Sequence, residues 1–160
     1  MGAQVAVERR VDRGGEPVAD LVAGPAEMHG TDVLPQELPS LIDEVPVLAA
    51  LAARAAGETR ITGATELRYK ESDRLAALAA GLRAVGVEAE ELPDGIVVRG
   101  TDRPLRGRVR THGDHRIAMT FGVLAALRGN DIGVDQPDVV AISYPGFWDA
   151  LRSLQRPQRR

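Results

Sequence analysis

Two segments of this chain are so apolar that helices formed from them would have to be buried on nearly every side. In residues 40–56, Val, Leu and Ala cover almost every face of a helical projection, and Gly57 follows. Residues 117–127 are similarly apolar and are followed by Gly129. A helix that is apolar all round belongs in a protein interior. The sequence therefore predicts a core made of helices, with the strands outside them.

The elements around the two apolar helices recur in the same order. Each helix is opened by an aspartate, Asp43 or Asp114, and is followed by a short strand that includes Ile61 or Ile132. We interpret the repeat as strand, buried helix, strand, exposed helix and hairpin. Two units are visible, and a third is represented only by a closing hairpin within residues 1–24. Repeated units usually bury a shared core together, so both aspartate ends should converge on one face of an α/β domain.

A charged stretch, residues 70–74, precedes apolar residues at helical spacing, and we expect it to form the first turn of a helix that runs to about Val85. Its N-cap is predicted near Ser72 or Glu71. Lys70 and Arg74 share one face at the positive end of the helix, which costs stability unless an anion lies between them. The stretch is therefore a candidate site for phosphate or carboxylate. The alternative is a solvated first turn with local ion pairs.

Two further elements have clear sequence signals. Residues 92–95, Leu-Pro-Asp-Gly, predict the turn of a hairpin between two short strands. Residues 145–154 have the spacing of an amphipathic helix, with Phe147, Leu151 and Leu154 predicted to face inward.

Charge and cysteine content narrow the class of protein. The net charge of -3 comes from mixed signs, which gives no indication of a nucleic-acid partner. The absence of cysteine excludes disulfides, a thiol nucleophile and a cysteine metal site, and it fits a reducing cytoplasm. No apolar run approaches the length of a membrane span and no signal peptide is visible, so we expect no membrane partner.

Four motifs follow one another in a specific order: LIDEVP at 41–46, KESDR at 70–74, GDHRIAM at 113–119 and SYPGF at 143–147. Together they closely resemble the C-terminal part of the 5-enolpyruvylshikimate-3-phosphate synthase (3-phosphoshikimate 1-carboxyvinyltransferase) family. The resemblance covers essentially the whole chain. It implies an inside-out α/β fold of βαβαββ units, in which helices are buried and sheets lie outside.

The resemblance also implies an activity. It is the cytoplasmic transfer of the enolpyruvyl group from phosphoenolpyruvate to the 5-hydroxyl of shikimate 3-phosphate, with release of phosphate and without a metal or organic cofactor. This is the shikimate-pathway step, on the route to chorismate and aromatic amino acids, that glyphosate targets. Residues 1–154 would be most of one domain, the tail of one repeat unit plus two units, with a frayed tail at 155–160. The partner would be the family's N-terminal domain, without which we expect this fragment to be inactive.

Five residues match the family's site residues. Asp43 matches the aspartate that binds shikimate 3-phosphate and accepts the 5-hydroxyl proton, and Glu71 matches a glutamate proposed to handle the proton of the phosphoenolpyruvate methylene. Lys70 matches a lysine assigned to shikimate 3-phosphate. Arg74 and Arg116 match the arginines that hold phosphoenolpyruvate, whose carboxylate and phosphate suit a planar guanidinium.

Neighbouring residues are expected in supporting roles. His115 is interpreted as a donor behind the substrate contacts rather than a catalyst, and Asp114 as a helix cap or a structural partner of Arg116. Ile142 occupies a position at which some family members carry a lysine that contacts phosphoenolpyruvate, so that contact is missing here.

Three other interpretations remain open on the sequence. A UDP-N-acetylglucosamine enolpyruvyl transferase shares the fold and reaction type, although its motifs differ from KESDR. The chain could also be a non-catalytic structural fragment, or one half of a split enzyme.

Overall fold

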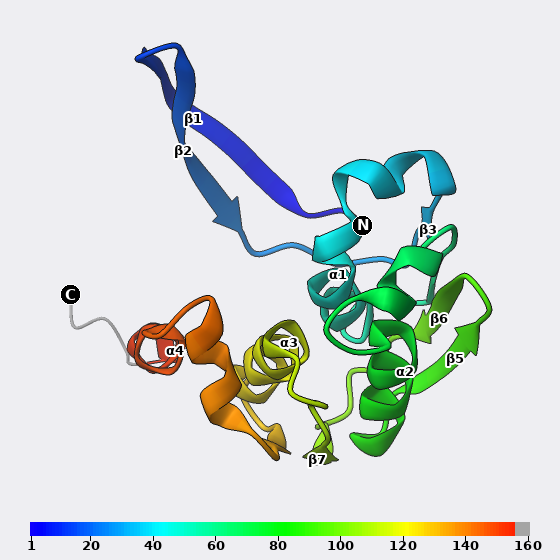
Figure 1. Cartoon of the computed structure of the whole chain (residues 1–160). Helices are drawn as coiled ribbons and strands as arrows, with labels where there is room; N and C mark the ends of the chain where they lie inside the picture. The colour runs from blue at the N-terminus through cyan, green and yellow to red at the C-terminus, as the bar shows by residue number, and fades with distance from the viewer. Residues whose placement is uncertain (156–160) are drawn as a thin grey trace.

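Helices and strands alternate along the computed structural model, which describes residues 1–155 (Figure 1). In chain order the elements are β1 (Gln4–Arg13), β2 (Glu16–Gly24), β3 (Asp32–Val33), α1 (Val45–Ala52), β4 (Glu58–Ile61), α2 (Arg74–Ala84), β5 (Glu88–Leu92), β6 (Gly95–Arg99), β7 (Arg106–Val109), α3 (His115–Ala126), β8 (Asp131–Val134) and α4 (Phe147–Gln155). Short 3-10 helices at Pro35–Ser40, Ile42–Glu44, Thr65–Tyr69 and Pro137–Ile142 join them. The predicted α/β class is confirmed.

The predicted repeat is visible in the strand pairing. β3 and β4 are parallel neighbours connected through α1, and β7 and β8 are parallel neighbours connected through α3. α2 follows β4 and α4 follows β8, so the two units share one order of elements. The hairpin predicted around residues 92–95 is formed by β5 and β6, which complete a four-stranded sheet in the order β3-β4-β6-β5.

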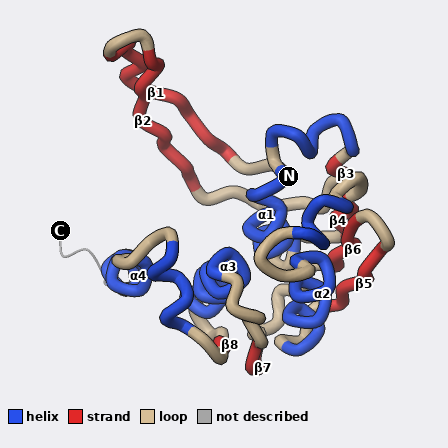
Figure 2. The backbone as a smooth tube through the Cα atoms, viewed as in Figure 1, coloured by secondary structure: helices blue, strands red, loops and turns tan. Residues whose placement is uncertain are grey.

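α1, α2 and α3 occupy the middle of the molecule, and the strands of the two units and α4 lie at its periphery (Figure 2). α1, α2 and α3 contact one another pairwise. Their shared core includes Val45, Leu78, Ile117 and Phe121, all fully buried. Buried helices with outer sheets are therefore confirmed. None of the helices within residues 1–155 is both long and apolar enough to cross a membrane.

α1 is shorter and less buried than the sequence predicts. In place of one helix over 40–56, a 3-10 turn at Ile42–Glu44 precedes α1 at Val45–Ala52. Val47 and Leu51 are 37% and 44% exposed, so burial on every side is a wrong prediction for the described chain. The reason is that α2, α3 and the sheet cover only part of the helix surface.

α2, predicted as the exposed helix of its unit, is largely buried. It packs against β5 and β6 and also against α3 and β7. Gly81 allows the close approach of α3, because a Cβ atom at Gly81 would lie 2.4 Å from the Phe121 ring. Helical spacing identified the inward stripe of α2, but it could not show that neighbours cover the helix on two sides.

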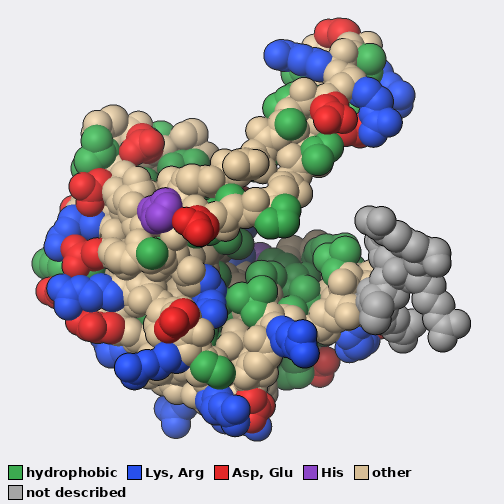
Figure 3. Space-filling model, turned by 180° about the vertical axis from the view of Figure 1, so that it is seen from behind, with side chains coloured by type: hydrophobic (Ala, Val, Ile, Leu, Met, Phe, Trp, Pro, Cys, Tyr) green, Lys and Arg blue, Asp and Glu red, His purple; other side chains and the backbone are tan. Residues whose placement is uncertain are grey.

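The hairpin expected within residues 1–24 is formed by β1 and β2, which pair antiparallel from Gln4 with Gly24 to Arg13 with Glu16. Gly14 and Gly15 make the turn with positive φ angles of 66° and 88°. The hairpin stands away from the rest of the molecule (Figures 1 and 3), and nearly all of its residues are exposed.

The last helix, α4, confirms part of the predicted pattern. Phe147 is buried, and its ring meets Trp148 edge-on with 4.9 Å between centroids. Leu154 was predicted to face inward, but it is 80% exposed, although the next residue, Gln155, donates to the Ala126 carbonyl of α3 at 2.9 Å. Gln155 is the last residue of α4 rather than part of a frayed tail, and the rest of the predicted tail, 156–160, lies outside the described residues.

Candidate active site

The charged stretch at 70–74 is a bend that leads into α2, not the first helical turn that the sequence predicts. Asp73 is the N-cap of α2, and its Oδ1 accepts a hydrogen bond from the Ala76 N–H at 3.0 Å. Lys70 has an extended backbone, which places it outside the helix. The predicted cap near Ser72 is therefore one residue early, because the Asp73 carboxylate binds the orphan N–H groups of the first turn instead.

Asp114 is the N-cap of α3. Its Oδ1 accepts hydrogen bonds from the backbone N–H groups of Arg116, at 2.9 Å, and Ile117, at 3.4 Å. The capping role predicted for Asp114 is confirmed. Its side-chain partners are different residues: Oδ2 accepts from the Arg74 guanidinium at 2.8 Å and from the Ser72 hydroxyl at 3.0 Å.

Arg74 lies at the centre of the site and is only 1% exposed. Its Nε binds Asp114, its Nη1 lies 3.1 Å from Asp43 Oδ1, and its Nη2 binds Glu71 Oε2. One guanidinium thus connects three carboxylates from three parts of the chain. The convergence of the Asp43 and Asp114 ends, predicted from the repeat, is confirmed by their shared partner.

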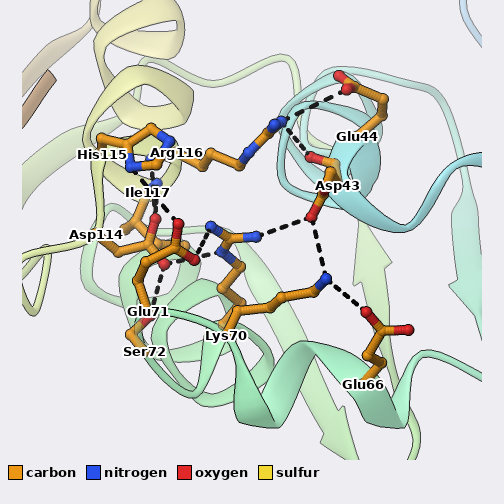
Figure 4. A network of polar contacts seen from close by, with 11 residues as sticks. Asp43, Glu44, Glu66, Lys70, Glu71, Ser72, Asp114, His115, Arg116 and Ile117 are labelled. Carbon is orange, nitrogen blue, oxygen red and sulfur yellow. Dashed lines mark hydrogen bonds and ion pairs between the residues drawn. The ribbon is translucent and has the colours of Figure 1, made fainter. Parts of the chain in front are cut away.

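Lys70 lies between two carboxylates (Figure 4). Its Nζ is 3.6 Å from Asp43 Oδ1 and 2.5 Å from Glu66 Oε1. The hydrogen bond to Glu66 raises the pKa of Lys70 above its ordinary value; burial acts the other way, and the charge of Asp43 adds to the rise. Lys70 is therefore a firmly protonated cation that faces Asp43.

Arg116 connects the start of α3 to the start of α1. Its Nη1 donates to the Asp43 backbone carbonyl at 2.8 Å and lies 3.5 Å from Glu44 Oε1 (Figure 4). A largely apolar cleft of about 220 Å³ opens beside these residues, between α1 and α3. Arg116 thus has one face against the protein and lies next to open space.

His115 lies behind Glu71. The residue is 8% exposed, and its Nδ1 is buried without a hydrogen-bond partner. The nearest acidic atom is Glu71 Oε1, 3.9 Å away, which is beyond hydrogen-bond distance. The structure thus places His115 next to a predicted site residue.

Burial of Asp114 would by itself raise the pKa of its carboxyl. The hydrogen bond and charge of Arg74, helped by the hydrogen bonds from Ser72 and the Arg116 backbone, outweigh burial and hold that pKa below its ordinary value. Asp114 is therefore an anion at neutral pH, as the buried pair with Arg74 requires.

The site carries more negative than positive charge. Three cations, Lys70, Arg74 and Arg116, meet five carboxylates, Asp43, Glu44, Glu66, Glu71 and Asp114. The formal sum is -2, and every cation has an acidic partner. The surface is also open, because the side chains of Asp43 and Glu71 are 44% and 49% exposed. An anionic ligand would need additional cations to bind tightly here.

Sequence reasoning treats Arg68 and Asp73 as local ion pairs, and it missed Glu66 and the wider contacts of Arg68. Glu66 pairs with Lys70 from the 3-10 helix at Thr65–Tyr69, and the four-residue spacing between them could have indicated the pair. Arg68 donates to Asp73 and to Glu91, both at 2.8 Å, and also to two backbone carbonyls of the β5–β6 turn. No local signal connects Arg68 with that turn, since the partners are far apart in sequence.

Two further points concern Ile142 and metal binding. Ile142, where some relatives carry a lysine, is 73% exposed at the end of the 3-10 helix Pro137–Ile142. Within residues 1–155, no three His, Cys, Asp or Glu side chains are grouped in a way that could hold a metal ion.

Comparison with known proteins identifies a family. Residues 1–151 match the family model described as EPSP synthase (3-phosphoshikimate 1-carboxyvinyltransferase). The 3-phosphoshikimate 1-carboxyvinyltransferase of Phenylobacterium zucineum is 47% identical over 156 residues, which cover 96% of this chain and 34% of that protein. The corresponding protein of Sulfurihydrogenibium sp. is 46% identical, with 98% and 36% covered.

Solved structures agree with the sequence comparison. The EPSP synthase of Acinetobacter baumannii superposes with a TM-score of 0.83 at 35% identity, over 96% of this chain and 36% of that one. The chain therefore spans about a third of the length of the relatives it matches. On the family match, the sequence identity and the shared fold, the chain belongs to the EPSP synthase family.

Proposed function

We propose that this chain forms one wall of an active site that transfers the enolpyruvyl group of phosphoenolpyruvate to shikimate 3-phosphate. The observation that carries the proposal is the convergence of Arg74, Lys70 and Arg116 on Asp43 and Glu71 at one face. Cations suited to two anionic substrates thus lie beside carboxylates suited to proton transfer. The relatives' names describe this carboxyvinyl transfer.

The substrate-binding roles follow from the side chains. Arg74 and Arg116 bind phosphoenolpyruvate, because a guanidinium can make paired hydrogen bonds to a carboxylate or a phosphate. Lys70 and Asp43, whose side chains lie 3.6 Å apart, bind shikimate 3-phosphate: the ammonium as a charge partner and the carboxylate as a hydroxyl acceptor. No metal or organic cofactor takes part in the proposed reaction.

The chemical steps require proton transfer at two places. The 5-hydroxyl oxygen of shikimate 3-phosphate attacks C2 of phosphoenolpyruvate while Asp43 accepts the hydroxyl proton. Glu71 delivers a proton to the methylene carbon of phosphoenolpyruvate. The product of this addition is a tetrahedral ketal phosphate. Its breakdown returns the methyl proton to a carboxylate, breaks the C–O bond to phosphate and leaves the enolpyruvyl ether. Arg74 and Arg116 stabilise the negative charge throughout.

The remaining cations come from elsewhere in the full-length protein. We propose that residues 1–154 form most of one enolpyruvyl-transferase domain, the tail of one unit and two further units, and that the facing domain closes the site. The formal charge of -2 and the open surface support this, since preorganised positive charge and exclusion of water both depend on a second wall. We propose a cytoplasmic location, in keeping with the cysteine-free sequence.

The proposal is tested by phosphate release from phosphoenolpyruvate plus shikimate 3-phosphate. The assay uses this chain alone, the remaining two thirds of a relative alone, and their mixture. We expect release only from the mixture, and its loss on Asp43→Asn or Glu71→Gln. Asp149→Asn, at an exposed position on α4, is the control and should not change the rate. A silent mixture of two folded parts would contradict the proposal, and so would an ordinary enzymatic rate from this chain alone.

The acceptor is tested in the same mixture. UDP-N-acetylglucosamine in place of shikimate 3-phosphate should give no phosphate release. Phosphate release with UDP-N-acetylglucosamine but not with shikimate 3-phosphate would assign the chain to enolpyruvyl transfer onto UDP-N-acetylglucosamine.

A further inference from the structure

The buried Nδ1 atom of His115 is the one polar side-chain atom within the described chain that is buried and has no hydrogen-bond partner. Buried polar atoms in native proteins are nearly always hydrogen-bonded, so an exception needs an explanation. This one faces the predicted site, because the closest acidic atom is Glu71 Oε1 at 3.9 Å. His115 Nδ1 is thus a potential hydrogen-bond donor or acceptor that has no partner in this structure.

Glu71 is placed to be its partner. One carboxylate oxygen, Oε2, is bound to Arg74 Nη2, and the other, Oε1, faces His115 (Figure 4). Glu71 comes from the bend ahead of α2, and its side chain is 49% exposed. A shift of about 1 Å would bring the carboxylate within hydrogen-bond distance of Nδ1.

Arg74 is only 1% exposed, so an anion cannot reach its guanidinium while all three carboxylate partners stay in place. Its Nε, Nη1 and Nη2 are each directed at a carboxylate, from Asp114, Asp43 and Glu71. Asp114 is 0% exposed and is fixed by the cap of α3 and by Ser72, so it is the least able to leave. An incoming anion must therefore displace one of the two exposed carboxylates.

Asp43 has a second cation close by, because Lys70 Nζ lies 3.6 Å from its Oδ1. Glu71 has no second cation; its alternative is the unpartnered Nδ1 of His115. We infer that Glu71 exchanges partners, from Arg74 as seen in this structure to His115 when an anion occupies Arg74, and that His115 is its positioning residue. The inference rests on the proposed function, which supplies phosphoenolpyruvate as the anion.

The exchange would serve the proposed chemistry, because it clears Arg74 Nη2 for the substrate carboxylate while Glu71 stays at the edge of the site. No bond is made or broken in the exchange itself, because a neutral imidazole with its proton on Nδ1 donates one hydrogen bond to Glu71.

The test is nitrogen-15 NMR of the full chain, which contains three histidines, during titration with phosphoenolpyruvate. The Arg74 Nε–H resonance reports occupancy of the site. Imidazole resonances, assigned with His29→Asn and His112→Asn, report whether His115 Nδ1 carries a hydrogen-bonded proton. We expect a protected Nδ1–H signal from His115 to grow with occupancy, and to be absent in Glu71→Ala, which has no side-chain acceptor, at equal occupancy.

The outcomes separate the inference from the function. A shift at Arg74 without any response at His115 overturns the exchange and leaves the proposed function intact. A His115 response that persists in Glu71→Ala assigns the histidine to another partner and also overturns the exchange. No shift at Arg74 at any concentration counts against phosphoenolpyruvate binding here, and it overturns the exchange as well, since nothing then displaces Glu71.

A second arm needs no ligand. Arg74→Gln removes the cation that holds Glu71, so the His115 Nδ1–H signal should appear without phosphoenolpyruvate and vanish in Arg74→Gln/Glu71→Ala. A folded Arg74→Gln variant that lacks the signal contradicts the inference. If this variant does not fold, as judged by circular dichroism, the titration alone decides.

Discussion

Arg74 and Asp114 form an ion pair from which water is excluded on both sides. Nε lies 2.8 Å from Oδ2, and the two side chains are 1% and 0% exposed. The pair joins the start of α2 to the N-cap of α3, so the bend that carries Lys70 and Glu71 is fixed relative to Arg116. Removing one partner of such a pair leaves an uncompensated buried charge.

Asp114→Asn should lower the free energy of unfolding by roughly 3–5 kcal/mol. Asparagine caps helices as well as aspartate does, so the loss isolates the charge and not the cap. Urea unfolding, followed through the single tryptophan, Trp148, measures it. Asp149→Asn, which breaks an exposed pair with Arg152, should change stability by no more than about 0.5 kcal/mol. Equal losses in the two variants would contradict this account.

The contribution of Asp114 should depend on pH with a definite sign. Burial opposes ionisation of Asp114, but Arg74 outweighs it and lowers the pKa, so the folded protein binds the proton less readily than the unfolded chain. The stabilisation is therefore complete above about pH 4, near the unfolded value. The stabilisation is lost as the pH falls through the lower pKa that Asp114 has in the folded protein. The urea midpoints of wild type and Asp114→Asn should converge in acid. A difference between the two midpoints that stays constant from pH 7 to acid would refute the stabilising role of the Asp114 charge.

Arg68→Lys should destabilise the chain by about 1–3 kcal/mol. Arg68 donates to Asp73, Glu91 and two carbonyls of the β5–β6 turn, and an ammonium cannot span these partners at once. Urea unfolding measures the loss. Arg60→Lys, at an exposed arginine that bonds only Glu58, is the matched control and should stay within about 0.5 kcal/mol of wild type. An equally small effect at Arg68 would show that the turn needs no such support.

Glu66→Gln should lower the pKa of Lys70 toward its ordinary value. The hydrogen bond from Lys70 to Glu66 is the largest cause of the raised pKa, ahead of the charge of Asp43. Lys70 is the only lysine of the chain, so its side-chain NMR signal needs no assignment. A titration of Glu44→Gln, which alters the acid beside Arg116, should leave the Lys70 value in place. An unchanged value in Glu66→Gln would rule out the assigned pair.

Gly81→Ala should destabilise the chain by about 1–3 kcal/mol, although alanine is the better helix former. The added methyl would lie 2.4 Å from the Phe121 ring, where α2 and α3 approach each other. On the exposed face of the same helix, Ala80→Gly should cost about 1 kcal/mol from propensity alone. Thermal unfolding compares the two; a more stable Gly81→Ala protein would show that the helices separate at little cost.

Much of the fold could be predicted from the sequence because its cues are periodic and local. The apolar helix α3, its aspartate cap Asp114 and the turn at 92–95 stand where the pattern places them, whereas Asp43 lies in a 3-10 turn and does not cap α1. What the pattern could not supply depends on tertiary neighbours. α2 is buried because a sheet and α3 cover both of its sides, and Leu154 on α4 is exposed despite its helical spacing with Phe147 and Leu151.

The residues of the site could be predicted from the sequence, but their hydrogen-bond and ion-pair partners could not. Arg74, Asp43, Glu71 and Lys70 do lie together, as the motifs indicated. The sequence could not show that Arg74 binds three carboxylates, since Asp43 and Asp114 contact it from distant positions in the chain. Only the folded chain shows that its cations are already paired.

The most direct test of the central claim, that this chain carries a working wall of an enolpyruvyl-transfer site, is made on a chimaera. This chain replaces the matching third of the Phenylobacterium zucineum relative, and phosphate release from phosphoenolpyruvate and shikimate 3-phosphate is measured. We predict an active chimaera whose rate falls by at least ~10²-fold on Arg74→Lys, because the fork-shaped donor is lost. A folded but inactive chimaera, or an Arg74→Lys rate equal to that of the parent, would contradict the claim.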